Sequence, residues 1–262
     1  MNNTIFQVKS FFNYWLDNVD EHSLHSPFFF KFYTNILKGQ LHEEVTERLE
    51  GYRNKLIADE RSLFVKDLGA GSAFFNANSP RMVRDIARTS ISPQKYSSLY
   101  LRIIKAYSYN TILELGTSLG INALYLASSP SSQVTTFEGA EEVAGIAEEL
   151  FKSAAVQNIK LVNGNIDESL PEVLKTINLV DFALIDANHR YEPTLKYFDL
   201  LVSKVAPDSM VALDDIHSSA DMEKAWTAIQ QDARVWATAD LYRCGLVFFN
   251  PSLNKQHVVL RF

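Results

Sequence analysis

From about residue 111 onward, short apolar runs alternate with longer segments of helical period. Runs rich in β-branched residues favour strands, and apolar residues three and four apart favour amphipathic helices. The expected strands are 111–115, 133–138, 159–163, 179–186 and 209–214. The expected helices are 119–128, 141–155, 167–176 (capped by Asp167), 192–203 and 220–231. Such alternation predicts an α/β fold in which helices cover both faces of a mostly parallel sheet.

The end of the chain breaks this rhythm. Three further expected strands, 235–240, 245–249 and 257–261, are joined by short connections. A parallel crossover needs a dozen or more residues, so short connections predict antiparallel pairing. We therefore expect the sheet to end in an antiparallel hairpin.

The first 60 residues are predicted to be helical and amphipathic, and ten aromatic residues lie within the first 33. Apolar residues at helical spacing indicate helices over 8–19 and 28–37. Further helices are expected over 41–57, 81–88 and 94–107. The segment 67–79 is rich in Gly, Ser and Asn and is expected to be a loop, with 67–72 forming a structural turn or a lid that contacts the site.

Composition excludes several classes of protein. The 262 residues carry 25 Lys+Arg against 31 Asp+Glu, a net charge of −6, which disfavours a nucleic-acid binder. Cys244 is the only cysteine, so neither an intrachain disulfide nor a cysteine-based metal site is expected. The sequence shows no targeting segment and no apolar run of transmembrane length. We expect a cytoplasmic protein without membrane or nucleic-acid partners.

The first chemical signal is a glycine-containing turn that follows the strand 111–115. Gly116 and Gly120 permit a tight turn at the carboxyl end of a strand, where open α/β sheets bind ligands. Glu138 ends the next strand and could accept hydrogen bonds from both hydroxyls of a ribose. The G-x-x-x-G spacing differs from the dinucleotide pattern, and Glu114 suits an amino-bearing ligand better than a pyrophosphate. This combination favours S-adenosylmethionine over NAD; the alternatives are a turn without a ligand and a solvated acid.

The second signal is a set of acids that end the following two strands. Asp186 ends one strand, and Asp214 and Asp215 end the next. Neighbouring parallel strands bring such ends together, where unpaired acids repel one another. A divalent cation, with Mg²⁺ the best match to hard oxygen ligands, would relieve the repulsion; the alternative is a helix cap. His217 would add a ligand or simply lie in the loop.

These segments together resemble a known family. ILELGTSLG, TTFEGA, FALIDANHRYEPT and VALDDIH are similar to motifs of class I S-adenosylmethionine-dependent methyltransferases, within them the metal-dependent catechol O-methyltransferase-like group. The resemblance covers roughly residues 90–250. It implies a Rossmann-like, seven-stranded, mostly parallel sheet with an antiparallel C-terminal hairpin, preceded here by a helical extension.

The resemblance also implies roles for individual residues. Glu114, Gly116 and Ser118 would line the methionine end of the cofactor, Glu138 would hold the ribose, Asn165 would lie by the adenine, and Lys95 belongs to a segment like the family's cofactor-covering region. Asp186, Asp214 and Asp215 match metal ligands, although the family commonly has Asp-Asn where this chain has Asp-Asp. His189 stands where the family has a lysine general base, so His189 or Asp186 would take the proton.

We therefore expect metal-assisted O-methylation of a small-molecule hydroxyl. Residues 91–262 would form the methyltransferase domain, and 1–90 a helical extension that covers the cofactor cleft, supplies a wall facing the substrate, or forms a homodimer contact. One alternative is a catalytically inactive cofactor-binding or interaction protein. A Rossmann dehydrogenase is a further alternative, disfavoured by the glycine spacing.

Overall fold

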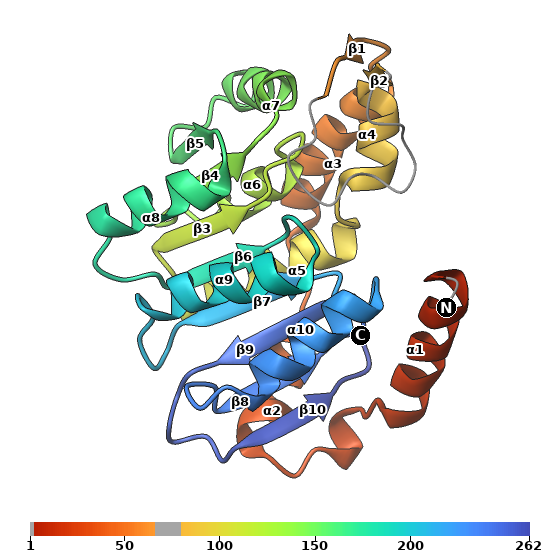
Figure 1. Cartoon of the computed structure of the whole chain (residues 1–262), viewed down its shortest axis with the longest axis vertical. Coiled ribbons are helices and arrows are strands. Elements are labelled where there is room, and N and C mark those ends of the chain that lie inside the picture. Colours follow the sequence, from red (N-terminus) through yellow and green to blue (C-terminus); the bar gives the residue numbers. More distant parts are fainter. Residues whose placement is uncertain (1–2, 66–79) are drawn as a thin grey trace. The chain divides into compact units, whose positions relative to one another are not determined.

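A computed structural model describes residues 3–65 and 80–262 (Figure 1). Their contacts define two compact units. The central unit is Gln40–Thr176, and the terminal unit combines Met1–Gly39 with Ile177–Phe262. The described part of the predicted extension 1–90 is thus shared between the two units, and its role as a lid stays a prediction. The predicted loop 67–79, with the turn or lid at 67–72, lies outside the described residues.

The central unit is built on three parallel strands in the order β3-β4-β5. These strands are β3 (Thr111–Leu115), β4 (Gln133–Glu138) and β5 (Ile159–Asn163), each with the bounds predicted from the sequence. The helices are α3 (Glu43–Ile57), α4 (Val83–Ser90), α5 (Gln94–Tyr107), α6 (Ile121–Leu126), α7 (Glu141–Ser153) and α8 (Ile166–Thr176). A short antiparallel pair, β1 (Ser62–Leu63) and β2 (Arg81–Met82), precedes α4, so the predicted helix from residue 81 begins two residues later.

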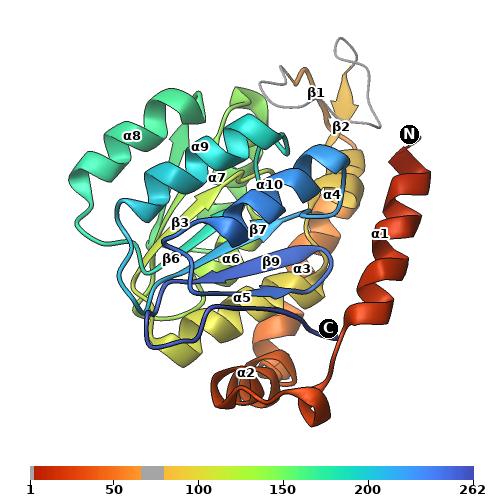
Figure 2. The ribbon, with the colours of Figure 1, turned by 60° about the horizontal axis from the view of Figure 1, so that its bottom comes forward.

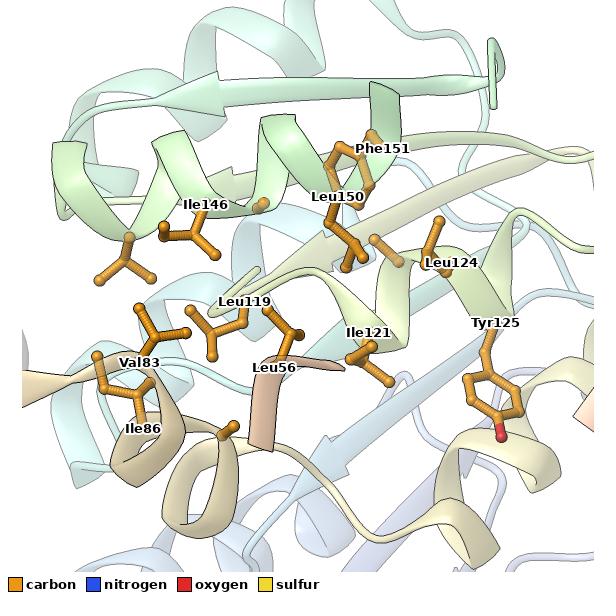
Figure 3. Packing of buried hydrophobic residues seen from close by; sticks show 14 of the residues in the cluster. Leu56, Val83, Ile86, Leu119, Ile121, Leu124, Tyr125, Ile146, Leu150 and Phe151 are labelled. Carbon is orange, nitrogen blue, oxygen red and sulfur yellow. The ribbon is translucent and has the colours of Figure 1, made fainter. Parts of the chain in front are cut away.

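The core of the central unit lies between helices α3, α4, α6 and α7 (Figure 3). Leu119 and Ile121, which follow the glycine turn, point into this core together with Leu56, Val83 and Phe151 (Figure 3). Burial of such side chains contributes roughly 1.5–3 kcal/mol each. The turn after β3 is therefore held in place by the apolar packing of the residues that follow it.

The terminal unit contains five strands in the order β10-β8-β9-β7-β6. They are β6 (Phe182–Ile185), β7 (Met210–Asp214), β8 (Ala237–Asp240), β9 (Cys244–Phe248) and β10 (Gln256–Val259). Strands β6 and β7 are parallel, whereas β9 runs antiparallel to both β7 and β8. The predicted antiparallel hairpin is thus confirmed as β8–β9. Strands β6, β7 and β9 are buried along their whole length, as expected for strands covered on both faces.

Strand β10 departs from the prediction of antiparallel pairing at the end of the chain. It pairs in parallel with β8. With β10, the strands of the described sheet number eight, whereas the family resemblance implies seven. The reason is geometric: β9 ends beside the start of β8, so the chain reaches β10 through a short loop without a long crossover.

Helices cover both faces of the β9 strand in the terminal unit. Helices α9 (Tyr191–Val202) and α10 (Ala220–Gln231) lie side by side on one face (Figure 2). Trp226 of α10 is buried against Gly245 of β9 and belongs to the core. On the other face, α2 (Pro27–Phe32) packs its rings on Phe248.

The N-terminal segment is tied to the C-terminal strands by backbone bonds. Helix α1 (Asn3–Asp17) leads to Val19, whose N–H donates to the carbonyl of Val259 over 2.9 Å and whose carbonyl accepts from the N–H of Arg261 over 2.9 Å. The Tyr14 hydroxyl donates to the carbonyl of Leu260 over 2.7 Å. The side chain of Ser26 caps the start of α2, which continues as a π-helical turn over Tyr33–Leu37. Within the described residues, no helix is long and apolar enough to cross a membrane.

We predict that Phe29→Ala lowers the free energy of unfolding by about 3–5 kcal/mol, because it leaves a cavity against Phe248. Phe29 is fully buried, whereas the neighbouring Phe30 is 45% exposed. Phe30→Ala is the matched control and should change stability by less than about 0.5 kcal/mol. Urea denaturation of both variants measures the difference. Equal effects would contradict the packing of α2 on β9.

Candidate functional site

The turn after β3 is held in a conformation that needs glycine. Gly116 and Gly120 have φ values of 102° and 88°, and Ser118 between them has φ of 47°. The N–H groups of Gly116 and Thr117 both donate to the carbonyl of Phe137, over 3.0 and 2.9 Å. A Cβ on Gly120 would lie 2.7 Å from the Phe151 ring. Sequence and core packing therefore fix this turn between β3, β4 and the start of α6.

Glu114 is a fully buried acid at the base of the turn. Its Oε2 accepts a hydrogen bond of 2.6 Å from Thr136, whose hydroxyl is also 2.6 Å from that of Thr117. Burial raises the pKa of Glu114 to about 8, the Thr136 bond opposes the rise, and the charge of Glu138 adds to it. Its Oε1 has no hydrogen-bond partner within the described residues. Glu114 thus keeps an unused oxygen where a ligand amino group could bind.

Glu138 braces the same turn from the end of β4. Its Oε2 accepts from the backbone N–H of Ser118 over 2.9 Å, and its Oε1 accepts from the N–H of Ala140 over 2.9 Å. Each carboxylate oxygen can accept more than one hydrogen bond, so Glu138 can still receive ribose hydroxyls. The buried hydroxyl oxygen of Ser118 has no partner in the described part of the chain. The structure thus brings Glu114, Gly116, Ser118 and Glu138 together around one turn.

Asn165 follows strand β5, and its side chain caps α8. Its Oδ1 accepts from the N–H of Asp167 over 3.0 Å, so the cap predicted at Asp167 is wrong by two residues. The reason is that an Asx oxygen reaches the N–H two residues further along, which places the cap before the helix. Asn165 itself is exposed, and its contact with adenine stays a prediction.

Lys95 is an exposed residue in the first turn of α5. The start of this helix is joined to α6 through Asn122, whose Nδ2 donates to Ser92 over 3.1 Å and whose Oδ1 accepts from Ser97. Helix α6 begins directly after Gly120. The segment that carries Lys95 is therefore fixed relative to the glycine turn, and the contact of Lys95 with a cofactor stays a prediction.

In the terminal unit, Asp186 and His189 lie in the loop after β6. The Nε2 of His189 is 3.5 Å from Oδ1 of Asp186, and both side chains are partly exposed. Asn188 and His189 have φ values of 66° and 35°, a left-handed conformation that non-glycine residues adopt at a cost. Asn188 donates to the Tyr197 hydroxyl over 3.2 Å, which holds the loop in this form. The structure thus brings the two predicted candidates for the base together.

Arg243 lies directly against the acids that end β7, and the sequence prediction missed it. Asp214 is fully buried, and its Oδ2 accepts from Nη2 of Arg243 over 2.9 Å and from Nε over 3.2 Å. The same Nη2 is 3.4 Å from Oδ1 of Asp215, whose φ is 56°. Burial and the charge of Asp214 raise the pKa of Asp215, and the charge of Arg243 opposes that rise. The predicted hairpin could have revealed this contact, because pairing of β7 with β9 sets Cys244, the residue next to Arg243, opposite Asp214.

His217 is engaged with acids of its own. Its Nε2 is 2.7 Å from Oδ2 of Asp240, and its Nδ1 is 3.9 Å from Glu223. Burial lowers the pKa of His217, but the hydrogen bond and charge of Asp240 outweigh burial, so the net shift is upward. Its ring stacks on Tyr242. Of the two predicted roles, this arrangement fits a loop residue rather than a metal ligand.

The predicted metal site does not fit the side chains that the structure describes. Over residues 3–65 and 80–262, no group of three or more His, Cys, Asp or Glu side chains could hold a metal ion. Asp214 is already neutralised by Arg243, and Asp215 shares the same guanidinium. A divalent cation needs several oxygen ligands with free lone pairs. The arrangement of Asp186, Asp214 and Asp215 beside Arg243 therefore differs from the metal-ligand set that the resemblance implies.

Comparison with known proteins agrees with this description of the fold. Residues 113–216 match a family model described as Methyltransferase domain. Among solved structures, an S-adenosylhomocysteine-bound methyltransferase of Podospora anserina, PaMTH1, has a TM-score of 0.56 at 14% identity, covering 80% of this chain and 97% of that one. No curated protein sequence matches the chain.

Two further solved structures are O-methyltransferases. One, from Bacillus cereus in complex with S-adenosylhomocysteine, has a TM-score of 0.54 at 16% identity, covering 79% of this chain and 92% of that one. The other, TomG from Streptomyces achromogenes in complex with S-adenosylmethionine, has a TM-score of 0.54 at 13% identity, covering 80% and 91%. The likeness at these identities establishes the fold. The resemblance to class I methyltransferases and the Rossmann-like α/β fold with antiparallel strand pairs are confirmed.

We predict that Glu114 makes the stability of the ligand-free protein depend on pH. The pKa of Glu114 rises from 4.5 to about 8 on folding, so the folded state holds the proton more tightly. The free energy of unfolding of the wild type, relative to Glu114→Gln, should therefore fall as pH rises from about 4.5 to about 8. Urea denaturation across this range measures it. Glu44→Gln, at an exposed position of α3, is the control and should leave the slope unchanged; equal slopes in both variants would refute the assignment.

We also predict that Gly120→Ala destabilises the protein by roughly 1–3 kcal/mol, because the new Cβ meets Phe151 at a positive φ. Gly145 lies in helix α7 with nothing within 4 Å of a Cβ, so Gly145→Ala should be neutral or stabilising by up to about 1 kcal/mol. Thermal unfolding of the two variants gives the comparison. A neutral Gly120→Ala would show that the turn can relax.

Proposed function

We propose that this protein is an S-adenosylmethionine-dependent methyltransferase that methylates a hydroxyl oxygen of a small molecule. The observation that carries the proposal is the pair of buried, unpaired oxygens at the glycine turn, Glu114 Oε1 and Ser118 Oγ, within the described residues. Buried polar atoms without partners are rare in folded proteins, and a ligand that bonds to them would satisfy both oxygens. The turn lies within the segment that matches the methyltransferase family.

The residues of the central unit would bind the cofactor. Glu114 would receive its amino group, because an acid of raised pKa can pair with an ammonium by giving up its proton. Ser118 would offer its unused hydroxyl, and Glu138 would receive the two ribose hydroxyls while its backbone bonds keep it in place. When bound, S-adenosylmethionine supplies a methyl group already activated by the sulfonium sulfur.

The residues of the terminal unit would handle the acceptor proton. His189 lies 3.5 Å from Asp186, so Asp186 would orient the ring and stabilise it once protonated. The hydroxyl proton would pass to His189 as the oxygen forms its bond to the methyl carbon and the carbon–sulfur bond breaks. Asp186 as the base itself is the alternative. In either case the protein contributes mainly by positioning the acceptor.

A catalytically inactive cofactor-binding or interaction protein is the second candidate. The observation that favours it is the apolar face of α1, where Ile5, Val8, Phe12 and Trp15 are each more than half exposed. Monomeric proteins seldom expose a continuous apolar stripe of this kind. Both candidates bind S-adenosylmethionine, and only the first forms a methylated product.

We predict that Glu138→Gln weakens binding of S-adenosylmethionine by about tenfold, because neutral Gln loses the charge-assisted bonds to ribose. Titration calorimetry measures this. His189→Ala should bind normally but lower turnover by about 10²–10⁴-fold, followed by mass spectrometry in a screen of hydroxylated small molecules. His22→Ala is the control for the second variant, since this side chain is 85% exposed and outside the loop. Absence of cofactor binding would refute the proposal, and cofactor binding without product from any acceptor would favour the second candidate.

A further inference from the structure

We propose that the guanidinium of Arg243 takes the place of a divalent cation at the acidic ends of β6 and β7, so that this protein needs no metal ion. The consequence for methyl transfer rests on the proposed function. The assignment of the cation itself rests only on side chains within the terminal unit. Arg243 would act as a positioning residue that holds Asp214 and Asp215 and supplies a fixed positive charge.

Arg243 forms a close ion pair with the acids that end β7. Nε and Nη2 of Arg243 both point at the carboxylate of Asp214, at distances from 2.9 to 3.3 Å, and Nη2 is shared with Asp215 at 3.4 Å. Asp214 is fully buried, and a buried carboxylate requires a counter-charge. The negative charge of Asp186 is also close enough to favour the charged guanidinium. One arginine thus pairs with two of the three acids that were predicted to bind a metal and is attracted by the charge of the third.

Backbone hydrogen bonds also hold Arg243 at this position. Its N–H donates to the carbonyl of Leu241 over 3.0 Å, and its carbonyl accepts from the N–H of Ile216 over 3.2 Å. The preceding Tyr242 has φ of 69° and donates its N–H to Asp240 over 2.7 Å. The bond to Ile216 joins the hairpin turn to the loop that follows Asp215. Arg243 is therefore held in the site by both the hairpin turn and the loop that follows Asp215.

Charge and ligand geometry both oppose a divalent cation beside Arg243. A divalent cation bound to Asp214 and Asp215 would lie within a few ångströms of the guanidinium, and the two cations would repel each other. It would also compete for carboxylate oxygens that already accept from Arg243. Arginine cannot give up its proton to make room, because its pKa stays far above neutral pH. The site therefore accommodates one cation or the other.

The arginine still has donors to offer. Its side chain is 32% exposed, and within residues 3–65 and 80–262 no hydrogen bond uses Nη1. Nη1 can donate to an oxygen of an acceptor molecule and favour its charged form, which is one effect that a bound metal would have. We therefore expect acceptors with an acidic hydroxyl or a neighbouring carboxylate to be preferred.

The test is a titration of the full-length protein with Mn²⁺, in which electron paramagnetic resonance measures free Mn²⁺. The wild type should show no stoichiometric binding. Arg243→Gln should bind Mn²⁺ at least roughly tenfold more strongly than the wild type, because three carboxylates lose their counter-charge. The double variant Arg243→Gln/Asp214→Asn is the matched control and should lose that gain. Stoichiometric binding to the wild type that Asp214→Asn abolishes would overturn the proposal, as would a folded Arg243→Gln that binds no better than the wild type.

Two further measurements complete the test of the proposal. If Arg243→Gln does not fold, Arg243→Lys replaces it: lysine keeps the charge, so this variant should also stay free of Mn²⁺, and stoichiometric binding to it would overturn the proposal. Turnover of the wild type should be unchanged by EDTA, and a loss restored by Mg²⁺ would contradict the assignment. Failure to bind S-adenosylmethionine would remove the proposed function but leave the Mn²⁺ result standing, so the two failures are distinguishable.

Discussion

A carboxylate that is buried has to be either protonated or paired with a cation, and this constraint applies to one candidate residue in each unit. Glu114 meets it by holding its proton, with one oxygen bonded to Thr136 and the other unused. Asp214 meets it by pairing with Arg243. The first solution leaves a group that can respond to an incoming ammonium. The second leaves an ion pair held by several hydrogen bonds.

The remaining features of the site follow from how these two acids are held. Around Glu114, Glu138 clamps the turn through Ser118, and Leu119 anchors it in the apolar core (Figure 3). Around Asp214, the hairpin turn brings in Arg243 and bonds its backbone to Ile216. Each acid thus has a local support made of backbone hydrogen bonds, which keeps its geometry independent of the exposed side chains nearby.

Much of the fold and part of the site could be predicted from the sequence, for identifiable physical reasons. Strands β3, β4 and β5 match the prediction residue for residue because their apolar runs end at glycine or polar residues. The clustering of Glu114, Ser118 and Glu138 follows from the ends of adjacent parallel strands. Arg243 was missed because its partner Asp214 is 29 residues away, and only the strand register brings them together. The parallel pairing of β10 was missed because the length of a connection does not show with which strand the next strand pairs.

The most direct test of the account is a crystal structure of the protein grown with S-adenosylhomocysteine and Mn²⁺, with anomalous diffraction recorded to locate manganese. The account predicts S-adenosylhomocysteine density in contact with Glu114, Ser118 and Glu138, and no anomalous peak at Asp214, where the Arg243 guanidinium should stay in place. Manganese coordinated by Asp186, Asp214 and Asp215 with Arg243 displaced would contradict it, and so would a cofactor bound away from the glycine turn.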